Sequence, residues 1–296
     1  MIILITGSTN GLGRLTAKKL VEQGHTVIIT GRSQSSLDEA RKWIVKDLEK
    51  HSKNLYELIM DLSDLKTIQT AIKTLESFKL DCIDVVVHNA GCVNSEFKRI
   101  GDTEATVFVN AVAPLYLNRL ILPFVEKSKH VEKKILFVAS SLHDPNIAGG
   151  SRSENARIPR NIQVKEDLQG SQEKWESMKY YRISKLASIW DAYSLASTQT
   201  IPVAAFCPGF VPTTDLNRNS GLFLRLAMRY ILPWFSFVTS EQDATDDYIF
   251  YITSRDLENG KYYRKREPCP SSKDSLDVSK QETYIAFANQ QINQLI

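Results

Sequence analysis

The chain has 296 residues, of which 43% are hydrophobic and 24% are charged, a composition typical of a globular protein rather than a disordered one. Its formal net charge of +3 is too small to indicate a nucleic-acid-binding surface. The four cysteines and five histidines lack the spacing of zinc ligands or of a disulfide framework. We therefore expect neither a metal site nor a nucleic-acid partner.

The sequence predicts neither a targeting segment nor a transmembrane segment. A strand-like run begins at Ile2, which leaves no room for the charged and apolar regions of a signal peptide. The most apolar later stretch, residues 221–238, is interrupted by Arg225, Arg229 and Pro233 and is too short and too charged to span a bilayer. Because unpaired cysteines suit a reducing compartment, we expect a cytoplasmic protein.

Short apolar runs alternate with amphipathic stretches over the first 210 residues. Runs rich in Val and Ile that lack polar alternation predict strands buried on both faces. They cover residues 2–6, 26–30, 55–60, 83–88, 135–139 and 203–206. The clearest helical repeat lies between them at residues 65–78, with Asp61 or Ser63 as the expected N-cap. The alternation predicts an α/β fold, a parallel sheet covered by helices on both faces.

Two segments depart from this alternation. Residues 142–179 are polar and contain proline and paired glycines, which predicts a long insert outside the sheet. Residues 214–240 are apolar and rich in bulky aromatic side chains. After them we expect a helix over residues 243–253, an edge strand over 261–263 and a terminal helix over 281–296.

A glycine-rich turn, TGSTNGLG, joins the first predicted strand to the first predicted helix. Glycines there let the backbone turn sharply and approach a pyrophosphate, whose charge lies at the helix N-terminus. The spacing is GxxxGxG rather than GxGxxG, and a simple tight turn is the alternative. We expect this turn to bind a dinucleotide through Gly7, Ser8, Thr9, Asn10, Gly11, Leu12 and Gly13.

The ends of the next two strands bear on the choice of cofactor. A site that selects NAD usually has an acid after the second strand for the ribose hydroxyls, but here Gly31 and Arg32 follow it. The guanidinium of Arg32 suits a phosphate, which predicts NADP; a solvated loop arginine is the alternative. Asp61 and Leu62 end the third strand, where the carboxylate would accept a hydrogen bond from the adenine amino group or act as a helix cap.

Tyr181 and Lys185 are four residues apart and so lie on one face of a helix. A phenol of pKa ~10 is a poor acid–base catalyst at neutral pH unless its anion is stabilised, and an ammonium one turn away does this. Tyr180 is roughly 140° round the helix from Lys185, so we expect it to pack elsewhere. A surface pair is the alternative interpretation of the YxxxK spacing.

Together these motifs resemble the short-chain dehydrogenase/reductase family over essentially the whole chain. Its TGxxxGxG motif matches the glycine turn, and its YxxxK motif matches Tyr181 and Lys185. The resemblance implies a catalytic tetrad completed by Asn110 and by a serine after the fifth strand. Of the adjacent pair we choose Ser141, because the family usually uses the second serine, and hold Ser140 in reserve. The remaining matches to cofactor-binding motifs are Asn89, Ala90, Gly91, Pro208, Gly209, Val211 and Thr213.

The resemblance also implies a fold and a mechanism. The fold is a Rossmann-type doubly wound parallel sheet of about seven strands in a single domain, residues 1–296. Tyr181 would donate a proton to a carbonyl oxygen while NADPH supplies hydride, and Ser141 would hydrogen-bond that oxygen. Lys185 would lower the tyrosine pKa and contact the ribose, and Asn110 would hold a water that links Lys185 to solvent.

The substrate is less closely specified. His88 replaces an asparagine of the usual motif and is expected to be a buried strand-end residue. The sequence at residues 166–168 and 184–187 resembles the retinol dehydrogenase branch. The sequence at residues 140–145, with the long insert, resembles the light-dependent protochlorophyllide reductase-like branch. We expect a hydrophobic ketone or aldehyde of retinoid, steroid or lipid type. The alternatives are a light-driven reductase of a tetrapyrrole double bond and a non-catalytic nucleotide-sensing protein.

The apolar segment 214–240 is expected to be a lid over the substrate. Two alternatives stay open: that it caps the sheet as core, or that it contacts a membrane surface with Arg225 and Arg229 facing lipid phosphates. A homodimer is also left open by the sequence.

Overall fold

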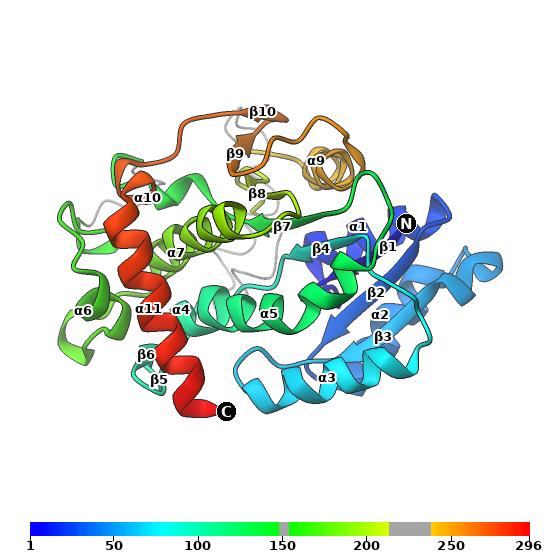
Figure 1. Ribbon diagram of the computed structural model, residues 1–296, viewed down its shortest axis with the longest axis horizontal. Coiled ribbons are helices and arrows are strands. Elements are labelled where there is room, and N and C mark those ends of the chain that lie inside the picture. Colours follow the sequence, from blue (N-terminus) through cyan, green and yellow to red (C-terminus); the bar gives the residue numbers. More distant parts are fainter. Residues whose placement is uncertain (148–153, 213–237) are drawn as a thin grey trace.

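The computed structural model describes residues 1–147, 154–212 and 238–296. Its centre is a sheet of eight strands in the order β10-β9-β8-β7-β4-β1-β2-β3 (Figure 1). The strands are β1 (Ile2–Ile5), β2 (Thr26–Gly31), β3 (Leu55–Ile59), β4 (Val85–His88), β7 (Lys134–Val138), β8 (Val203–Cys207), β9 (Lys261–Arg264) and β10 (Glu267–Pro268). All pairings are parallel except that of β9 with β10. The predicted parallel sheet is confirmed, with one additional short antiparallel edge strand.

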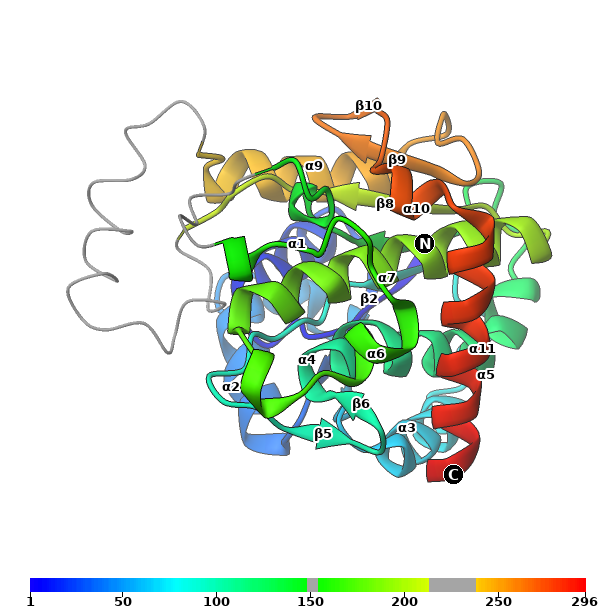
Figure 2. The same cartoon turned by 90° about the vertical axis from the view of Figure 1, so that its left-hand side faces the viewer.

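Helices cover both faces of this sheet, as Figures 1 and 2 show. The α-helices are α1 (Gly11–Glu22), α2 (Gln34–Val45), α3 (Leu65–Ser77), α4 (Ala105–Val107), α5 (Ala113–Glu126), α6 (Val164–Gln169), α7 (Ser177–Thr198), α9 (Glu241–Thr253), α10 (Lys273–Leu276) and α11 (Val278–Leu295). Helices α1, α2 and α9 pack in one hydrophobic cluster with one face of the sheet, and α3, α5, α7 and α11 in the other. A separate hairpin is formed by β5 (Arg99–Ile100) and β6 (Thr103–Glu104).

Strand β1 shows why the predicted strands lack polar alternation. Ile3 and Ile5 lie in the cluster with α1, α2 and α9, whereas Leu4 lies in the cluster on the opposite face. All three side chains are completely buried. Because successive side chains of a strand point to opposite faces, a sheet covered on both sides requires apolar residues at every position.

The local predictions were mostly confirmed, with one correction at α3. This helix is capped by Asp64, whose carboxylate accepts a hydrogen bond of 2.9 Å from the Lys66 N–H, and not by Asp61 or Ser63. Asp61 instead accepts bonds from the Ser63 backbone N–H (2.9 Å) and hydroxyl (2.8 Å). The expected late elements are present as α9, β9 and α11.

The two irregular segments are described only in part. The polar insert 142–179 contains α6 and single turns of 3₁₀ helix at Glu154–Ala156 and Gln172–Lys174, while residues 148–153 lie outside the described part. Of the expected lid 214–240, only residues 238–240 are described.

One described helical run, Ala105–Glu126, is long and apolar enough to cross a membrane by length and composition. It comprises α4, a π-helical turn (Phe108–Val112) and α5. Two-thirds of its most apolar window, 67%, is buried inside the fold, which is the behaviour of a core helix.

The strand order positions the functional motifs. Successive strands β1, β2 and β3 run outward to one edge, whereas β4 lies on the other side of β1, so the order reverses at β1. In open parallel sheets, ligands bind beyond the carboxyl ends of the strands at such a reversal. The loops that leave β1, β4, β7 and β8 are therefore brought together there.

Candidate active site

The glycine turn after β1 fits closely against the loop after β4. Gly7 has φ +61°, and a Cβ on it would lie 2.8 Å from the Cα of Ala90. A Cβ on Gly13 would lie 2.6 Å from the Asn89 Nδ2. Side chains are therefore excluded at both glycines. The described first turn of α1 also carries no acidic side chain, so the helix N-terminus suits an anion such as a pyrophosphate.

Asn89 and Thr6 hold these two loops together. The backbone N–H groups of Asn89 and Ala90 both donate to the Thr6 Oγ1 over 2.9 Å. The Asn89 Nδ2 donates to the carbonyl oxygens of Thr6 (2.8 Å) and Gly7 (3.2 Å). Asn89 and Ala90 thus shape the turn that the sequence predicts to hold the cofactor.

Ser8 has an internal role within the same turn. Its hydroxyl donates to the Ile5 carbonyl (2.8 Å) and accepts from the Thr30 N–H (2.9 Å), and its side chain is completely buried. The Ser8 N–H also donates to the Thr30 carbonyl over 3.1 Å, so Ser8 supports the turn rather than offering a hydrogen-bond donor to a cofactor.

The end of β2 has no space for an acid. A Cβ on Gly31 would lie 2.5 Å from the Thr9 Cγ2, so the acidic side chain that would accept ribose hydroxyls is excluded there. Arg32 is exposed, and no carboxylate in the described part of the chain pairs with it. At the end of β3 the Leu62 side chain is buried in the core, so only its backbone faces an adenine site.

Tyr181 lies on α7 and is paired with Ser140. The Ser140 hydroxyl lies close enough to that of Tyr181 to favour the phenolate, which lowers the pKa of Tyr181. Burial has the larger effect and raises that pKa. Within the described residues, the Ser141 hydroxyl makes no bond to Tyr181, and the Ser141 N–H points instead to the Cys207 Sγ at 3.3 Å. The structure thus brings Ser140, and not the expected Ser141, to the tyrosine.

Lys185 lies one turn after Tyr181, as its spacing predicts. Its Nζ is 5.7 Å from the centroid of the Tyr181 ring and donates a bond of 2.8 Å to the carbonyl of Val138, the last residue of β7. Burial lowers the pKa of Lys185 from 10.5 to about 8. Such an ammonium is poised to change its protonation state near neutral pH.

Asn110 connects the tetrad to the loop after β4. It lies in the π-helical turn between α4 and α5, a feature often found at functional sites. Its Oδ1 accepts from the Cys92 N–H (2.8 Å), and its Nδ2 donates to the Cys92 carbonyl (3.0 Å) and the Ser184 hydroxyl (2.9 Å). The Asn110 side chain therefore ties Cys92, the residue after Gly91, to α7.

Two neighbours are placed as the sequence predicts. Tyr180 is buried in the core against Gly170, and burial raises its pKa to about 12. His88 stacks on Phe137 with ring centroids 4.4 Å apart. Burial lowers the pKa of His88 to about 4, so this ring is neutral and structural.

The motif after β8 packs against the chain that leads into α9. Gly209 has φ +86°, and a Cβ on it would lie 2.0 Å from the Thr239 Oγ1. The Thr239 N–H donates to the Phe210 carbonyl over 2.9 Å. Pro208 precedes this turn and Val211 is buried in the core, whereas Thr213, expected to hold a carboxamide, lies outside the described residues.

Three residues near the site were missed from the sequence. The Cys207 Sγ accepts from the backbone N–H groups of Ser141 (3.3 Å) and Gly209 (3.4 Å). Tyr248 on α9 donates to Asn89, and His143 binds the Ser140 carbonyl. Cys207 is next to the Pro-Gly motif and His143 follows Ser140 by three residues, which were available signals; Tyr248 reaches the site only through the tertiary fold.

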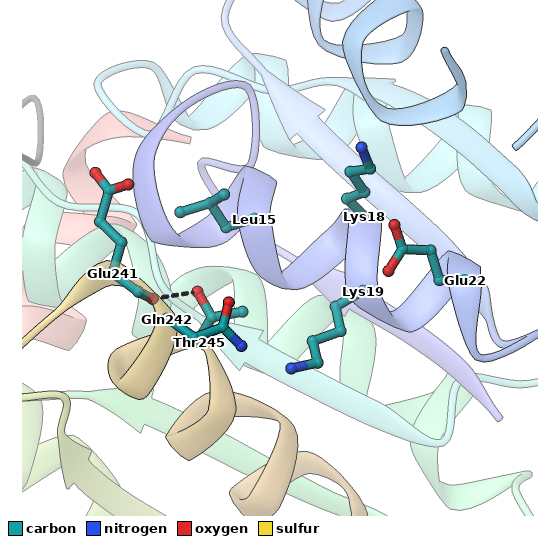
Figure 3. Close-up of a pocket in the computed structure, with 7 residues that line it drawn as sticks. All are labelled: Leu15, Lys18, Lys19, Glu22, Glu241, Gln242 and Thr245. Carbon is teal, nitrogen blue, oxygen red and sulfur yellow. Dashed lines mark hydrogen bonds between the residues drawn. The ribbon is translucent and has the colours of Figure 1, made fainter. Parts of the chain in front are cut away.

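A surface hollow of about 410 Å³ lies elsewhere, between α1 and α9 (Figure 3). Its lining includes Lys18, Lys19, Glu22 and Glu241, and Lys19 is bonded to Asp246. None of the lining residues belongs to the Tyr181–Lys185 cluster, so this hollow is a polar seam between two helices rather than part of the site.

Comparison with known proteins agrees with this geometry. The family model for short chain dehydrogenase matches residues 1–151. The short-chain dehydrogenase anuI of Penicillium roqueforti is 30% identical over 227 residues, covering 72% of this chain and 79% of the relative. The WW domain-containing oxidoreductase of Drosophila melanogaster is 26% identical over 299 residues, covering 99% of this chain and 68% of the relative.

A solved structure shows the same fold. A short chain dehydrogenase of Escherichia coli CFT073, complexed with NADPH, superposes with a TM-score of 0.63 at 21% identity, covering 90% of this chain and 96% of that one. The family match and the fold together place the chain in the short-chain dehydrogenase/reductase family, whose members are NAD(P)-dependent oxidoreductases acting on CH–OH groups.

Proposed function

We propose that this protein interconverts a carbonyl and an alcohol with NADPH as the hydride donor, and that Tyr181, Lys185, Ser140 and Asn110 form its catalytic tetrad. The observation that carries the proposal is the placement of Lys185 Nζ 5.7 Å from the Tyr181 ring, with the Ser140 hydroxyl close enough to lower the pKa of Tyr181. This replaces Ser141 with Ser140 as the tetrad serine. A non-catalytic nucleotide-binding protein would have no need of this arrangement.

The residues present fit NADP. Gly7 and Gly13 let the turn pack closely on the loop after β4, and Gly11, where a Cβ would meet nothing within 4 Å, leaves the N-terminus of α1 open to a pyrophosphate. Gly31 carries no acid of the kind that favours NAD, and exposed Arg32 is available for a 2′-phosphate. The NADPH complex of the Escherichia coli neighbour supports the same choice. Asp61 remains a candidate partner of the adenine amino group.

The mechanism follows from the protonation states at the site. Bound NADPH would supply the hydride to the carbonyl carbon. Tyr181 donates its proton to the carbonyl oxygen, where negative charge develops, and Ser140 donates a hydrogen bond to that oxygen. Lys185 stabilises the resulting phenolate, and its lowered pKa of about 8 lets it pass a proton on near neutral pH. Asn110, which is hydrogen-bonded to the Cys92 backbone, lies at the end of this path of proton transfer.

The proposed substrate is a hydrophobic ketone or aldehyde of retinoid, steroid or lipid type. Its support is the aromatic composition of residues 214–240, which follow the Pro-Gly motif directly, and the resemblance of residues 166–168 and 184–187 to the retinol dehydrogenase branch. We also propose that the protein acts in the cytoplasm.

The test is an assay of a panel of carbonyls with NADPH and with NADH. Turnover is measured as the loss of cofactor absorbance. The panel contains retinal, a steroid ketone, decanal and 4-nitrobenzaldehyde. We expect turnover with NADPH on at least one apolar carbonyl and weaker turnover with NADH. Tight NADPH binding without turnover of any of the four would contradict the proposed activity while leaving cofactor binding intact.

A further inference from the structure

His143 is buried between the tetrad serine and the C-terminal part of the chain. It ends the 3₁₀ turn Ser141–His143 and is only 2% exposed. Its Nδ1 lies 2.6 Å from the Ser140 carbonyl oxygen, and its Nε2 lies 3.0 Å from the backbone nitrogen of Ser272, the N-cap of α10. The ring edge packs on Tyr262 of β9, with centroids 5.0 Å apart.

These contacts define one protonation state of the ring. Ser272 can offer only its N–H to Nε2, so Nε2 must be the unprotonated acceptor. Nδ1 must then carry the proton and donate it to the Ser140 carbonyl, because a carbonyl can only accept. Burial lowers the pKa of His143, which favours this neutral form over the imidazolium.

The hydrogen bonds around Ser140 orient its hydroxyl. The Ser140 carbonyl accepts twice from His143, from the ring and from the backbone N–H (3.2 Å). The Ser140 Oγ accepts from the Leu142 N–H at 3.2 Å, so one of its lone pairs is occupied. The single hydroxyl proton of Ser140 is then available to Tyr181, whose pKa this serine lowers. The Leu142 N–H thus holds the Ser140 side chain, and His143 holds the Ser140 backbone carbonyl.

We propose that His143 is a positioning residue for the reaction: its Nδ1–H holds the Ser140 backbone so that the serine hydroxyl meets Tyr181 and the substrate oxygen, and its Nε2 anchors this arrangement to Ser272. The inference rests on the proposed role of Ser140. It couples the C-terminal segment at α10 to the geometry of the site, through a single imidazole.

Two substitutions test the two hydrogen bonds of the His143 ring separately. His143→Asn keeps an amide donor near the Nδ1 position and loses the acceptor for Ser272. His143→Gln keeps an acceptor near the Nε2 position and loses the donor to Ser140. Each removes one hydrogen bond, so we expect both to lower the thermal unfolding midpoint by similar amounts. We expect only His143→Gln to lower kcat, by at least about tenfold, with KM and NADPH affinity nearly unchanged.

As a control, His143→Gln is also introduced into the Ser140→Ala variant. If His143 acts through the serine hydroxyl, His143→Gln should change kcat by less than about twofold in that background, because the two effects are not independent. Equal kcat losses in His143→Asn and His143→Gln, or a full further loss in the Ser140→Ala background, would show a merely structural role and overturn the inference. An unchanged kcat in Ser140→Ala alone would overturn the proposed role of Ser140 and this inference with it.

A measurement without turnover checks the ring itself. Nitrogen-15 NMR of histidine-labelled protein should show His143 as the neutral Nδ1–H form at neutral pH. An Nε2–H form would contradict the contact with Ser272 and overturn the inference, whether or not any panel carbonyl is turned over.

Discussion

The Tyr248 hydroxyl donates a hydrogen bond of 2.7 Å to the Asn89 Oδ1, across 159 positions of the chain. Asn89 in turn donates to the carbonyl oxygens of Thr6 and Gly7. Helix α9 thus supports the glycine turn through a single side chain, and the shape of the expected cofactor site depends on a residue remote from every sequence motif.

Tyr248→Phe tests this support. Removing the hydroxyl leaves the Asn89 oxygen without its donor, and such a loss costs about 1–3 kcal/mol in the free energy of unfolding. We expect the affinity for NADPH to weaken severalfold as well, because the turn loses its brace. The matched control is Tyr251→Phe on the same helix, whose hydroxyl accepts from the Arg266 N–H (2.7 Å). It should lose stability but keep NADPH affinity.

Arg32→Ala tests cofactor selection. A hydrogen bond to a charged group contributes roughly 1.5–3 kcal/mol, so NADPH affinity should fall about 10- to 150-fold while NADH affinity stays nearly constant. Dissociation constants for both cofactors measure the effect, with Lys42→Ala, an exposed base on α2, as control. Equal NADPH and NADH affinities in the unaltered protein would remove the basis for this assignment.

Ser140→Ala and Ser141→Ala distinguish the adjacent serines. Loss of a donor to the developing oxyanion lowers turnover by about 10²-fold or more, so Ser140→Ala should have an effect of that size on kcat. Ser141→Ala should change kcat by far less, since its hydroxyl is not bonded to Tyr181. The reverse order of effects would restore Ser141 as the tetrad serine.

The buried Lys185 predicts a pH dependence of stability. Its pKa is about 8 in the folded protein and 10.5 ordinarily, so between these values the unfolded chain binds more protons and the free energy of unfolding rises with pH. Lys185→Met removes this contribution. The stability of the variant relative to the unaltered protein should therefore fall between about pH 8 and pH 10, by on the order of 2–3 kcal/mol.

Lys134 provides the control for that measurement. Burial lowers its pKa to about 8 as well, but it lies at the opposite end of β7 and bonds to the Ser254 carbonyl. Lys134→Met should alter the pH dependence of unfolding without reducing turnover. A relative stability of Lys185→Met that is constant with pH would show that Lys185 titrates in its ordinary range.

The sheet was predictable because its strands are buried on both faces, which required runs such as Val85–His88 to be apolar at nearly every position. The cap of α3 was not, because three possible capping residues fall within four positions and only backbone geometry selects Asp64. The choice between the two candidate tetrad serines was not settled by the sequence for a related reason. Ser140 and Ser141 are adjacent, and only the exit of the chain from β7 decides which hydroxyl meets Tyr181.

The supporting contacts could not be predicted because they join distant elements. His143 and Ser272 are separated by 129 positions, and Tyr248 occupies an ordinary core position of α9. Nothing in local spacing marks Tyr248, and although His143 follows Ser140 by only three residues, nothing local marks its contact with Ser272. In contrast, Tyr181 and Lys185 are one helical turn apart, so their spacing alone predicted that they lie on the same face of the helix.

The central claim is that Tyr181 is the proton donor, and the most direct measurement is kcat for Tyr181→Phe and Tyr180→Phe on the best panel substrate, with NADPH affinity measured alongside. Tyr181→Phe removes only the hydroxyl, so folding and NADPH binding should survive while kcat falls by about 10²-fold or more, as for a lost general acid. Tyr180→Phe should leave kcat nearly unchanged, since its ring packs in the core. Near-normal turnover by Tyr181→Phe would contradict the assignment of the tetrad and tyrosine-assisted hydride transfer itself.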